Sequence, residues 1–189
     1  MELLENRIRE EGVVLGNDIL KVDSFINHQM DVGFLYTLGL EFKRLYEGCD
    51  INKILTIESS GIAVAALAAL SFKVPMVFAK KSKSSNIGSD LYSTDVTSYT
   101  RGNTNRVVVS KKYLTPADKV LILDDFLAEG QSLLGLIDLC RQAGAQVVGC
   151  GVRIEKVYQG GGDLVRKTAR VEALARIAKM DENGIVFKQ

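Results

Sequence analysis

Apolar residues recur along the chain in two rhythms, one of about 3.6 residues, which favours helices, and one of two residues, which favours strands. Helical spacing includes Leu4 and Ile8 and ends at Gly12, and it returns between Asp31, a helix-capping residue type, and Gly48. Further helices are predicted at Gly61–Phe72 and Gln131–Gln142, and strands at Lys53–Glu58, Pro75–Lys80, Lys119–Asp125 and Gln146–Glu155.

Strands and helices alternate through the middle of the chain, which predicts an α/β fold with a central parallel sheet flanked by helices. Lys119–Asp125 is a nearly continuous apolar run, as expected of a strand covered on both faces. The turn signal Asn183-Gly184 lies between two β-rich runs, Arg170–Ile177 and Gly184–Lys188, and predicts a closing hairpin. The polar stretch from Lys80 to Asn105 shows almost no apolar periodicity, which predicts a long loop, either disordered or a functional lid.

Composition narrows the class of protein. With 189 residues, the chain is long enough for one domain with a single hydrophobic core. Its 24 basic and 23 acidic residues leave a net charge of +1, which argues against binding to the phosphate backbone of nucleic acid. The N-terminus lacks the apolar core of a signal peptide, and no apolar run reaches the roughly 20 residues of a membrane span. We therefore expect a cytoplasmic protein without membrane contact.

Cysteine and histidine usage gives little sign of metal or redox chemistry. Cys49, Cys140 and Cys150 form no CxxC pair, and His28 is the only histidine. We expect three reduced, mostly buried thiols, and we assign no residue as a metal ligand.

The segment Val120–Ser132, VLILDDFLAEGQS, carries the clearest chemical signal. Asp124 and Asp125 lie where a buried strand emerges from the predicted sheet, the edge at which open parallel sheets bind ligands. The turn over Ala128–Ser132 then opens a helix, whose free N–H groups and positive dipole end attract phosphate. Gly130 lets the backbone approach an anion closely, and the Ser132 hydroxyl adds a hydrogen bond.

Carboxylates would repel a phosphate placed beside them, so their partners are more plausibly sugar hydroxyls, Mg²⁺ or a positive charge formed in a reaction. A ribose phosphate meets all of these requirements. For an isolated pair of aspartates, ordinary strand-end residues that cap the next helix would be the better interpretation. The apolar run before the pair and the small-residue turn after it favour the functional one.

The Val120–Ser132 pattern resembles the ribose-phosphate loop of phosphoribosyltransferases, which bind 5-phosphoribosyl-1-diphosphate (PRPP). Glu129 and Gln131 depart from the Thr and Gly common in that loop, so Glu129 must aim its side chain away from the phosphate. The chain is most similar to the xanthine branch of the bacterial, adenine-transferase-like members. The segments that carry this similarity are Glu11–Leu15, Leu20–Asp31, Thr56–Ala63, Asp124–Gln131, Ile154–Lys156 and Val171–Ile177.

The resemblance implies a type I phosphoribosyltransferase fold in which a flexible loop, about 80–105, closes over the site. It implies a hood over the purine base formed by residues 1 to about 30 and the C-terminal segment. Thr97-Ser98-Tyr99 resembles the Ser-Tyr element of the closing lid. A lid would keep water from a cationic intermediate.

The resemblance also implies residue roles. Ala128, Glu129, Gly130, Gln131 and Ser132 would bind PRPP, together with Ser59 and Ser60 in a second anion loop. Of the cluster Lys80, Lys81 and Lys83, Lys81 would reach diphosphate, across a dimer interface. Leu20 would pack on the purine, and Asn27 and Lys156 would bind its edge, a lysine donor being suited to an oxo group. Without the resemblance, Ser59-Ser60 is about equally a capping turn, and a solvated basic run is the default interpretation of the lysine cluster. The alternatives for Leu20, Asn27 and Lys156 are a core leucine, a turn asparagine and a surface lysine.

The activity implied is transfer of the 5-phosphoribosyl group from PRPP to N9 of xanthine, giving xanthosine 5′-monophosphate and diphosphate in purine salvage. Mg²⁺ would be carried with PRPP, Asp124 and Asp125 would hold the ribose hydroxyls, and the enzyme would be a homodimer. Hypoxanthine/guanine and adenine phosphoribosyltransferases remain alternatives. So does a non-catalytic PRPP-binding regulator, although the balanced charge and the short N-terminal segment give no sign of a DNA-binding module.

Overall fold

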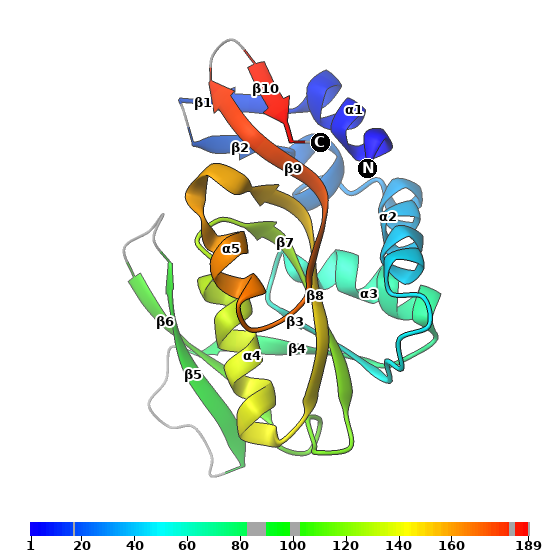
Figure 1. Cartoon of the computed structure of the whole chain (residues 1–189), viewed down its shortest axis with the longest axis vertical. Helices are drawn as coiled ribbons and strands as arrows, with labels where there is room; N and C mark the ends of the chain where they lie inside the picture. The colour runs from blue at the N-terminus through cyan, green and yellow to red at the C-terminus, as the bar shows by residue number, and fades with distance from the viewer. Residues whose placement is uncertain (17, 83–89, 99–102, 182–183, 189) are drawn as a thin grey trace.

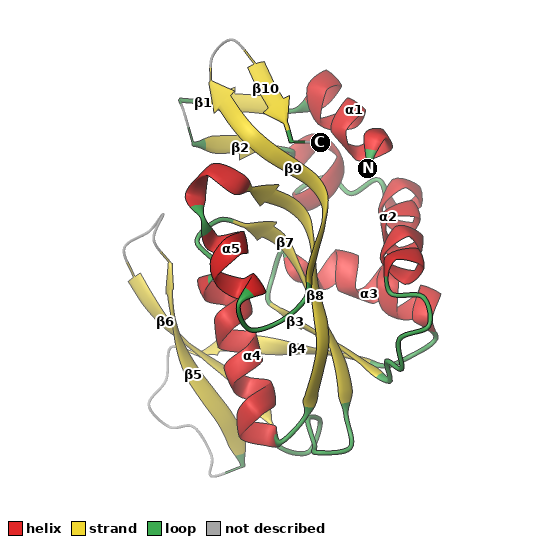
Figure 2. Cartoon of the chain, viewed as in Figure 1, coloured by secondary structure: helices red, strands yellow, loops and turns green. Residues whose placement is uncertain are grey.

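The chain forms a twisted sheet covered by helices on both faces (Figures 1 and 2). The structure, a computed structural model, describes residues 1–16, 18–82, 90–98, 103–181 and 184–188. The helices are α1 (Glu2–Glu11), α2 (Val32–Leu45), α3 (Gly61–Phe72), α4 (Gln131–Ala143) and α5 (Gly161–Arg166). The strands are β1 (Val13–Leu15), β2 (Ile19–Lys21), β3 (Lys53–Ile57), β4 (Met76–Ser82), β5 (Leu91–Ser98), β6 (Asn103–Ser110), β7 (Lys119–Leu127), β8 (Gln146–Lys156), β9 (Val171–Asp181) and β10 (Gly184–Phe187).

Within the described residues, eight strands form the main sheet in the order β10-β9-β8-β7-β3-β4-β6-β5. The pairs from β9 through β8, β7 and β3 to β4 are parallel, and the outer pairs β10-β9, β4-β6 and β6-β5 are antiparallel. The predicted α/β class with a central parallel sheet is therefore confirmed. The predicted closing hairpin is also present, as β9 and β10, although residues 182–183 at its turn lie outside the described residues.

Alternating side chains of β7 build the core on the two faces of the sheet. Leu121 and Leu123 pack with α2 and α3, whereas Val120 and Ile122 pack with α4 on the other side. All four are fully buried, which explains why this strand reads as an uninterrupted apolar run. β7 continues two residues beyond the predicted end at Asp125, because Phe126 and Leu127 still pair with Ile154 and Glu155 of β8.

The prediction of one long loop between Lys80 and Asn105 is wrong. β4 continues to Ser82, and β5 and β6 pair over eight residues as an antiparallel hairpin on the edge of the sheet. Polar residues hide the strand pattern because one face of this hairpin is largely exposed, while Val96 and Val107 on the other face pack against the core under α4. Residues 83–89 and 99–102, with Lys83 and Tyr99 among them, lie outside the described residues.

The N-terminal and C-terminal segments lie together at one end of the molecule (Figure 1). α1 contacts β9, and so does the small hairpin of β1 and β2. The sequence pattern predicted the helix but not this hairpin. Leu4 and Ile8 of α1 are fully buried against this end of the core. The segment leads through a π-helical turn, Asp23–Asn27, to Asp31, whose side chain accepts a hydrogen bond from the Phe34 N–H at 3.0 Å and caps α2 as predicted.

The three cysteines are free thiols, as predicted. Burial raises the pKa of Cys140 and of Cys150 to about 12. A thiol with so high a pKa carries almost no thiolate at neutral pH and is a poor nucleophile. No helix in the described part of the chain has both the length and the apolar character of a membrane span.

Candidate active site

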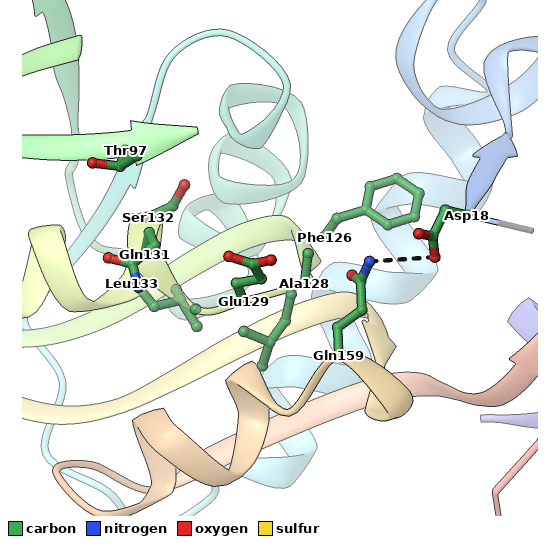
Figure 3. A pocket seen from close by; sticks show the side chains of 11 residues that line it. Asp18, Thr97, Phe126, Ala128, Glu129, Gln131, Ser132, Leu133 and Gln159 are labelled. Atoms are coloured by element: carbon green, nitrogen blue, oxygen red, sulfur yellow. Dashed lines mark hydrogen bonds between the residues drawn. The ribbon is translucent and has the colours of Figure 1, made fainter. Parts of the chain in front are cut away.

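A cavity of about 330 Å³ opens where β7 passes into α4 (Figure 3). One end is formed by the turn between these two elements, and the other end by residues that precede β2 or follow β8. Its lining residues are Asp18, Thr97, Phe126, Leu127, Ala128, Glu129, Gly130, Gln131, Ser132, Leu133 and Gln159. All five residues predicted for the loop from Ala128 to Ser132 therefore line one cavity.

The turn into α4 depends on Gly130. Its φ of +85° lies in the left-handed region, and a Cβ added there would meet Val165 Cγ2 at 2.9 Å. Gly130 is the N-cap of α4, and its carbonyl accepts the first helical hydrogen bond, from Leu134 N–H at 3.0 Å. The N–H groups of the first helical turn have no partner inside a helix, so they and the Ser132 hydroxyl are available to an anion in the cavity.

Asp124 faces the interior rather than the cavity. Its side chain is almost completely buried, and its Oδ1 accepts the Asp125 N–H at 2.9 Å. A Cβ added at Gly61, the first residue of α3, would come within 3.1 Å of the same oxygen. Burial raises the pKa of the Asp124 carboxyl well above its usual range, and the neighbouring Asp125 raises it further.

Asp125 lies closer to the surface, and its carboxylate faces a buried cation that the sequence analysis missed. Its Oδ2 is 3.9 Å from Nη2 of Arg153, a fully buried side chain on β8. The same Nη2 donates to the Ser60 carbonyl at 3.4 Å, so Arg153 lies between the two predicted substrate loops. An arginine inside the apolar run of β8 is a signal that the sequence does contain, because a buried charge needs a partner.

The second predicted anion loop lies at the end of β3, beside the end of β4. The Glu58 carboxylate accepts the Lys81 N–H at 2.6 Å, so the Ser59-Ser60 loop and Lys81 are neighbours. The Glu58–Ser59 peptide bond is cis. Ser59 and the Lys81 side chain are exposed and Ser60 is half-buried, and none of the three lines the 330 Å³ cavity.

The residues predicted to bind a purine do not line the cavity either. Leu20 is 8% exposed and packs in the core, and Asn27 is exposed at the end of the π-helical turn. The Lys156 ammonium donates a hydrogen bond to the Asp18 carbonyl. Asp18 Oδ1 in turn accepts from Gln159 Nε2 at 3.4 Å (Figure 3). This end of the cavity is therefore an Asp–Gln pair whose aspartate also binds Lys156 through its carbonyl. No local motif marks Asp18 or Gln159, because only the fold brings them together.

Comparison with known proteins identifies the family. Residues 42–183 match the phosphoribosyl transferase domain. The chain is 50% identical to a xanthine phosphoribosyltransferase of Latilactobacillus sakei over 188 residues, 99% of this chain and 96% of the relative, and 50% identical over 189 residues, 100% of both chains, to one of Clostridium novyi. The chain belongs to the phosphoribosyltransferase family.

Solved structures support the same fold. The adenine phosphoribosyltransferase of Giardia lamblia, complexed with 9-deazaadenine, superimposes with a TM-score of 0.78 at 22% identity, covering 92% of this chain and 97% of that chain. The adenine phosphoribosyltransferase of Rhodothermus marinus gives a TM-score of 0.75 at 18% identity, covering 94% and 100% of the two chains. The predicted type I phosphoribosyltransferase fold is thereby confirmed.

One detail of this phosphoribosyltransferase differs from expectation. Glu129 was predicted to point away from the anion site, yet its side chain lies among those that line the cavity (Figure 3). The physical reason is that α5 packs against the outer side of the loop, where Gly161 lies against the Ala128 carbonyl and Val165 against Gly130. The long Glu129 side chain therefore extends on the cavity side.

The acidic residues of the site suit a metal ion that arrives already bound to a diphosphate. In the parts of the chain that the structure describes, no group of three His, Cys, Asp or Glu side chains is placed to hold a metal ion. Asp124 is buried and hydrogen-bonded within the turn, and the Asp125 carboxylate faces Arg153. Mg²⁺ keeps several waters and commonly takes the rest of its ligands from substrate phosphates, which fits so sparse a protein donor set.

Proposed function

We propose that this enzyme transfers the 5-phosphoribosyl group from Mg·PRPP to N9 of xanthine, forming xanthosine 5′-monophosphate and diphosphate. The observation that carries the proposal is the loop Ala128–Ser132, which turns backbone N–H groups and a hydroxyl toward a cavity directly after paired carboxylates. Xanthine is proposed as the acceptor base because the chain is 50% identical, over nearly its whole length, to proteins named xanthine phosphoribosyltransferase. The activity belongs to purine salvage, because it rebuilds a nucleotide from a free base.

The reaction replaces one bond at ribose C1 with another. The bond from C1 to the diphosphate oxygen breaks, the bond from C1 to N9 forms, and N9 loses its proton. Positive charge develops at C1 as diphosphate departs. Catalysis then depends on placement and on electrostatic stabilisation of that charge. Mg²⁺ supplies charge neutralisation for the departing diphosphate.

Each group of residues has one task in this proposal. The backbone N–H groups of residues 128–132 and the Ser132 hydroxyl hold the 5′-phosphate, with the Glu129 carboxylate turned away from it. Asp125 holds the ribose hydroxyls near C1, and the buried Asp124 accepts the Asp125 N–H. Ser59, Ser60 and Lys81 bind the diphosphate. Leu20, Asn27 and Lys156 form the base subsite under a hood made by residues 1 to about 30 and the C-terminal segment. The Lys156 ammonium donates to the Asp18 carbonyl and has two further N–H donors, one of which would bind an oxo group of xanthine.

We further infer that the enzyme is a homodimer. The exposed side of α2 carries an apolar row, Val32, Tyr36 and Leu40, which are 60%, 38% and 41% exposed. Residues four apart lie on one face of a helix, and an exposed row of this kind is typical of an interface.

Three free thiols fit a cytoplasmic enzyme.

The proposal is tested by mixing the purified protein with Mg·PRPP and each of xanthine, guanine, hypoxanthine and adenine. We expect diphosphate release and xanthosine 5′-monophosphate formation with xanthine, at a kcat/KM well above those for the other three bases. Faster turnover of another base would identify one of the alternative transferases. Binding of PRPP without turnover of any base would instead identify a non-catalytic regulator.

Replacing Lys156 by Met is expected to raise KM for xanthine about 10-fold or more while KM for PRPP stays within about two-fold, since one charge-assisted hydrogen bond is worth roughly 1.5–3 kcal/mol. Methionine keeps the length of the side chain and removes only the ammonium. Steady-state kinetics with each substrate varied in turn measure the effect. An equal loss of kcat/KM with all purines would show that Lys156 does not recognise the base.

A further inference from the structure

The short helix α5 packs directly against the turn that lines the cavity. Gly161, its first residue, donates its N–H to the Ala128 carbonyl at 3.1 Å. A Cβ added at Gly161 would lie 2.2 Å from the Ala128 oxygen and 2.5 Å from the Gly130 nitrogen. All of these contacts are to backbone, so a side chain at position 161 cannot be accommodated unless the turn moves.

The contact between α5 and the turn is also close at Gly130, on the side of the turn. A Cβ added at Gly130 would lie 3.0 Å from the Gly161 carbonyl oxygen and 2.9 Å from Val165 Cγ2. Val165, a residue of α5, is fully buried. The two glycines therefore permit a close backbone approach between α5 and the turn, and the shape of the turn depends on where α5 lies.

An ion cluster around the buried Glu155 carboxylate fixes the position of α5. Glu155, at the end of β8, has a side chain that is 1% exposed and accepts two hydrogen bonds from Arg166 of α5, at 2.6 and 2.8 Å. Arg176 of β9 donates to the same carboxylate at 3.0 Å. A Cβ added at Gly162 would come within 1.8 Å of Glu155 Oε1, so this glycine is needed for the carboxylate to reach both arginines. Bidentate arginine–carboxylate pairs fix orientation as well as distance.

We propose that Gly161 is a positioning residue for the phosphoribosyl transfer: held by the Glu155–Arg166 pair, it sets the backbone of residues 128–130 in the geometry that binds the 5′-phosphate of PRPP. This inference rests on the proposed role of that turn. Gly161 contacts the turn from behind and does not line the cavity. A backbone displacement of about 1 Å at a binding loop can cost as much as 100-fold in rate.

The experiment compares Gly161→Ala with Gly33→Ala. Gly33 lies in the first turn of α2 and is exposed, and a Cβ added there would have only the Asp31 carboxylate within 4 Å, at 3.7 Å, so it is a matched glycine-to-alanine control. We expect Gly161→Ala to weaken PRPP binding, measured by calorimetry, about 10- to 100-fold and to raise KM for PRPP similarly, while KM for xanthine stays within about two-fold. The control is expected to match the wild type in all three values.

A second pair of variants tests the anchor without touching the turn. Arg166→Met removes the bidentate pair and is expected to weaken PRPP binding several-fold, and Arg166→Lys, which keeps one charged donor, is expected to recover part of it. The two Arg166 variants test the positioning role of Gly161 if Gly161→Ala does not fold. Unchanged PRPP binding in a folded Gly161→Ala protein, or an equal rise in both KM values, would overturn the inference. Wild-type protein that binds PRPP but forms no xanthosine 5′-monophosphate would contradict the proposed function instead.

Discussion

Asp125→Asn is expected to fold with a reduced free energy of unfolding, because it removes the carboxylate nearest the buried Arg153. It should keep KM for xanthine within about two-fold and lower kcat about 100-fold or more, the loss typical of removing one preorganised electrostatic contact to a transition state. The carboxylate lies on β7 three residues before the turn Ala128–Ser132 begins, beside the residues that line the cavity rather than among them. We place the ribose hydroxyls and the developing charge at C1 against it. Asparagine preserves the shape and can still accept the Phe126 N–H, which Asp125 Oδ1 now accepts at 2.8 Å. What disappears is the negative charge, the quantity that the mechanism requires.

The matched control is Asp50→Asn, because Asp50 is a surface carboxylate with a 75% exposed side chain paired with Lys119, far from the turn in sequence. It should leave kcat and both KM values unchanged. Circular dichroism and the unfolding midpoint establish that both variants fold. If folded Asp125→Asn turned over xanthine at the wild-type rate, the ribose role of Asp125 would be refuted, and the assignment of the β7 edge as the ribose site would fail with it.

The parts of the fold that sequence patterns predicted are those in which local spacing and burial agree. The apolar run of β7 needed no tertiary information, since both of its faces are buried and each residue in the run is apolar. The ends of α3 and the start of α4 were predicted to the residue, because a turn of small residues precedes each helix. The loop Ala128–Ser132 was found for the same reason: its residues are consecutive, so one stretch of sequence contains the whole anion-binding element.

The parts that could not be predicted depend on contacts between distant residues. Asp18 and Gln159 meet only because the N-terminal hairpin folds over the end of β8. The β5–β6 hairpin differs from the predicted loop because its exposed face carries Ser93, Asp95, Thr97 and Thr104, residue types that composition alone associates with loops. Arg153 was visible in the sequence, yet its role depends on Asp125 of β7 and on Ser60 in the turn between β3 and α3.

The Glu155 ion cluster predicts a pH-dependent contribution to stability. Burial raises the pKa of this carboxyl, but the hydrogen bonds and charges of Arg166 and Arg176 outweigh burial, and the net pKa is lowered from 4.5. A lowered pKa means that folding favours the ionised form. The stabilisation is therefore fully present above the unfolded pKa near 4.5 and is lost as the pH falls through the lower folded value.

Glu155→Gln is accordingly expected to lower the free energy of unfolding at pH 7 by about 1–2 kcal/mol, because it removes the charge that Arg166 and Arg176 share, while both arginines keep about a third of their surface in water. Urea unfolding at pH 7, 5, 4 and 3 measures the effect. The difference between wild type and variant should narrow as the pH falls below about 4.5, since protonation removes the same charge from the wild type. Glu10→Gln, an exposed position on α1, is the control and should follow the wild type at every pH. A stability difference that stayed constant from pH 7 to 3 would mean that glutamine perturbs packing alone, and the charge of Glu155 would then have no part in holding α5 against the turn.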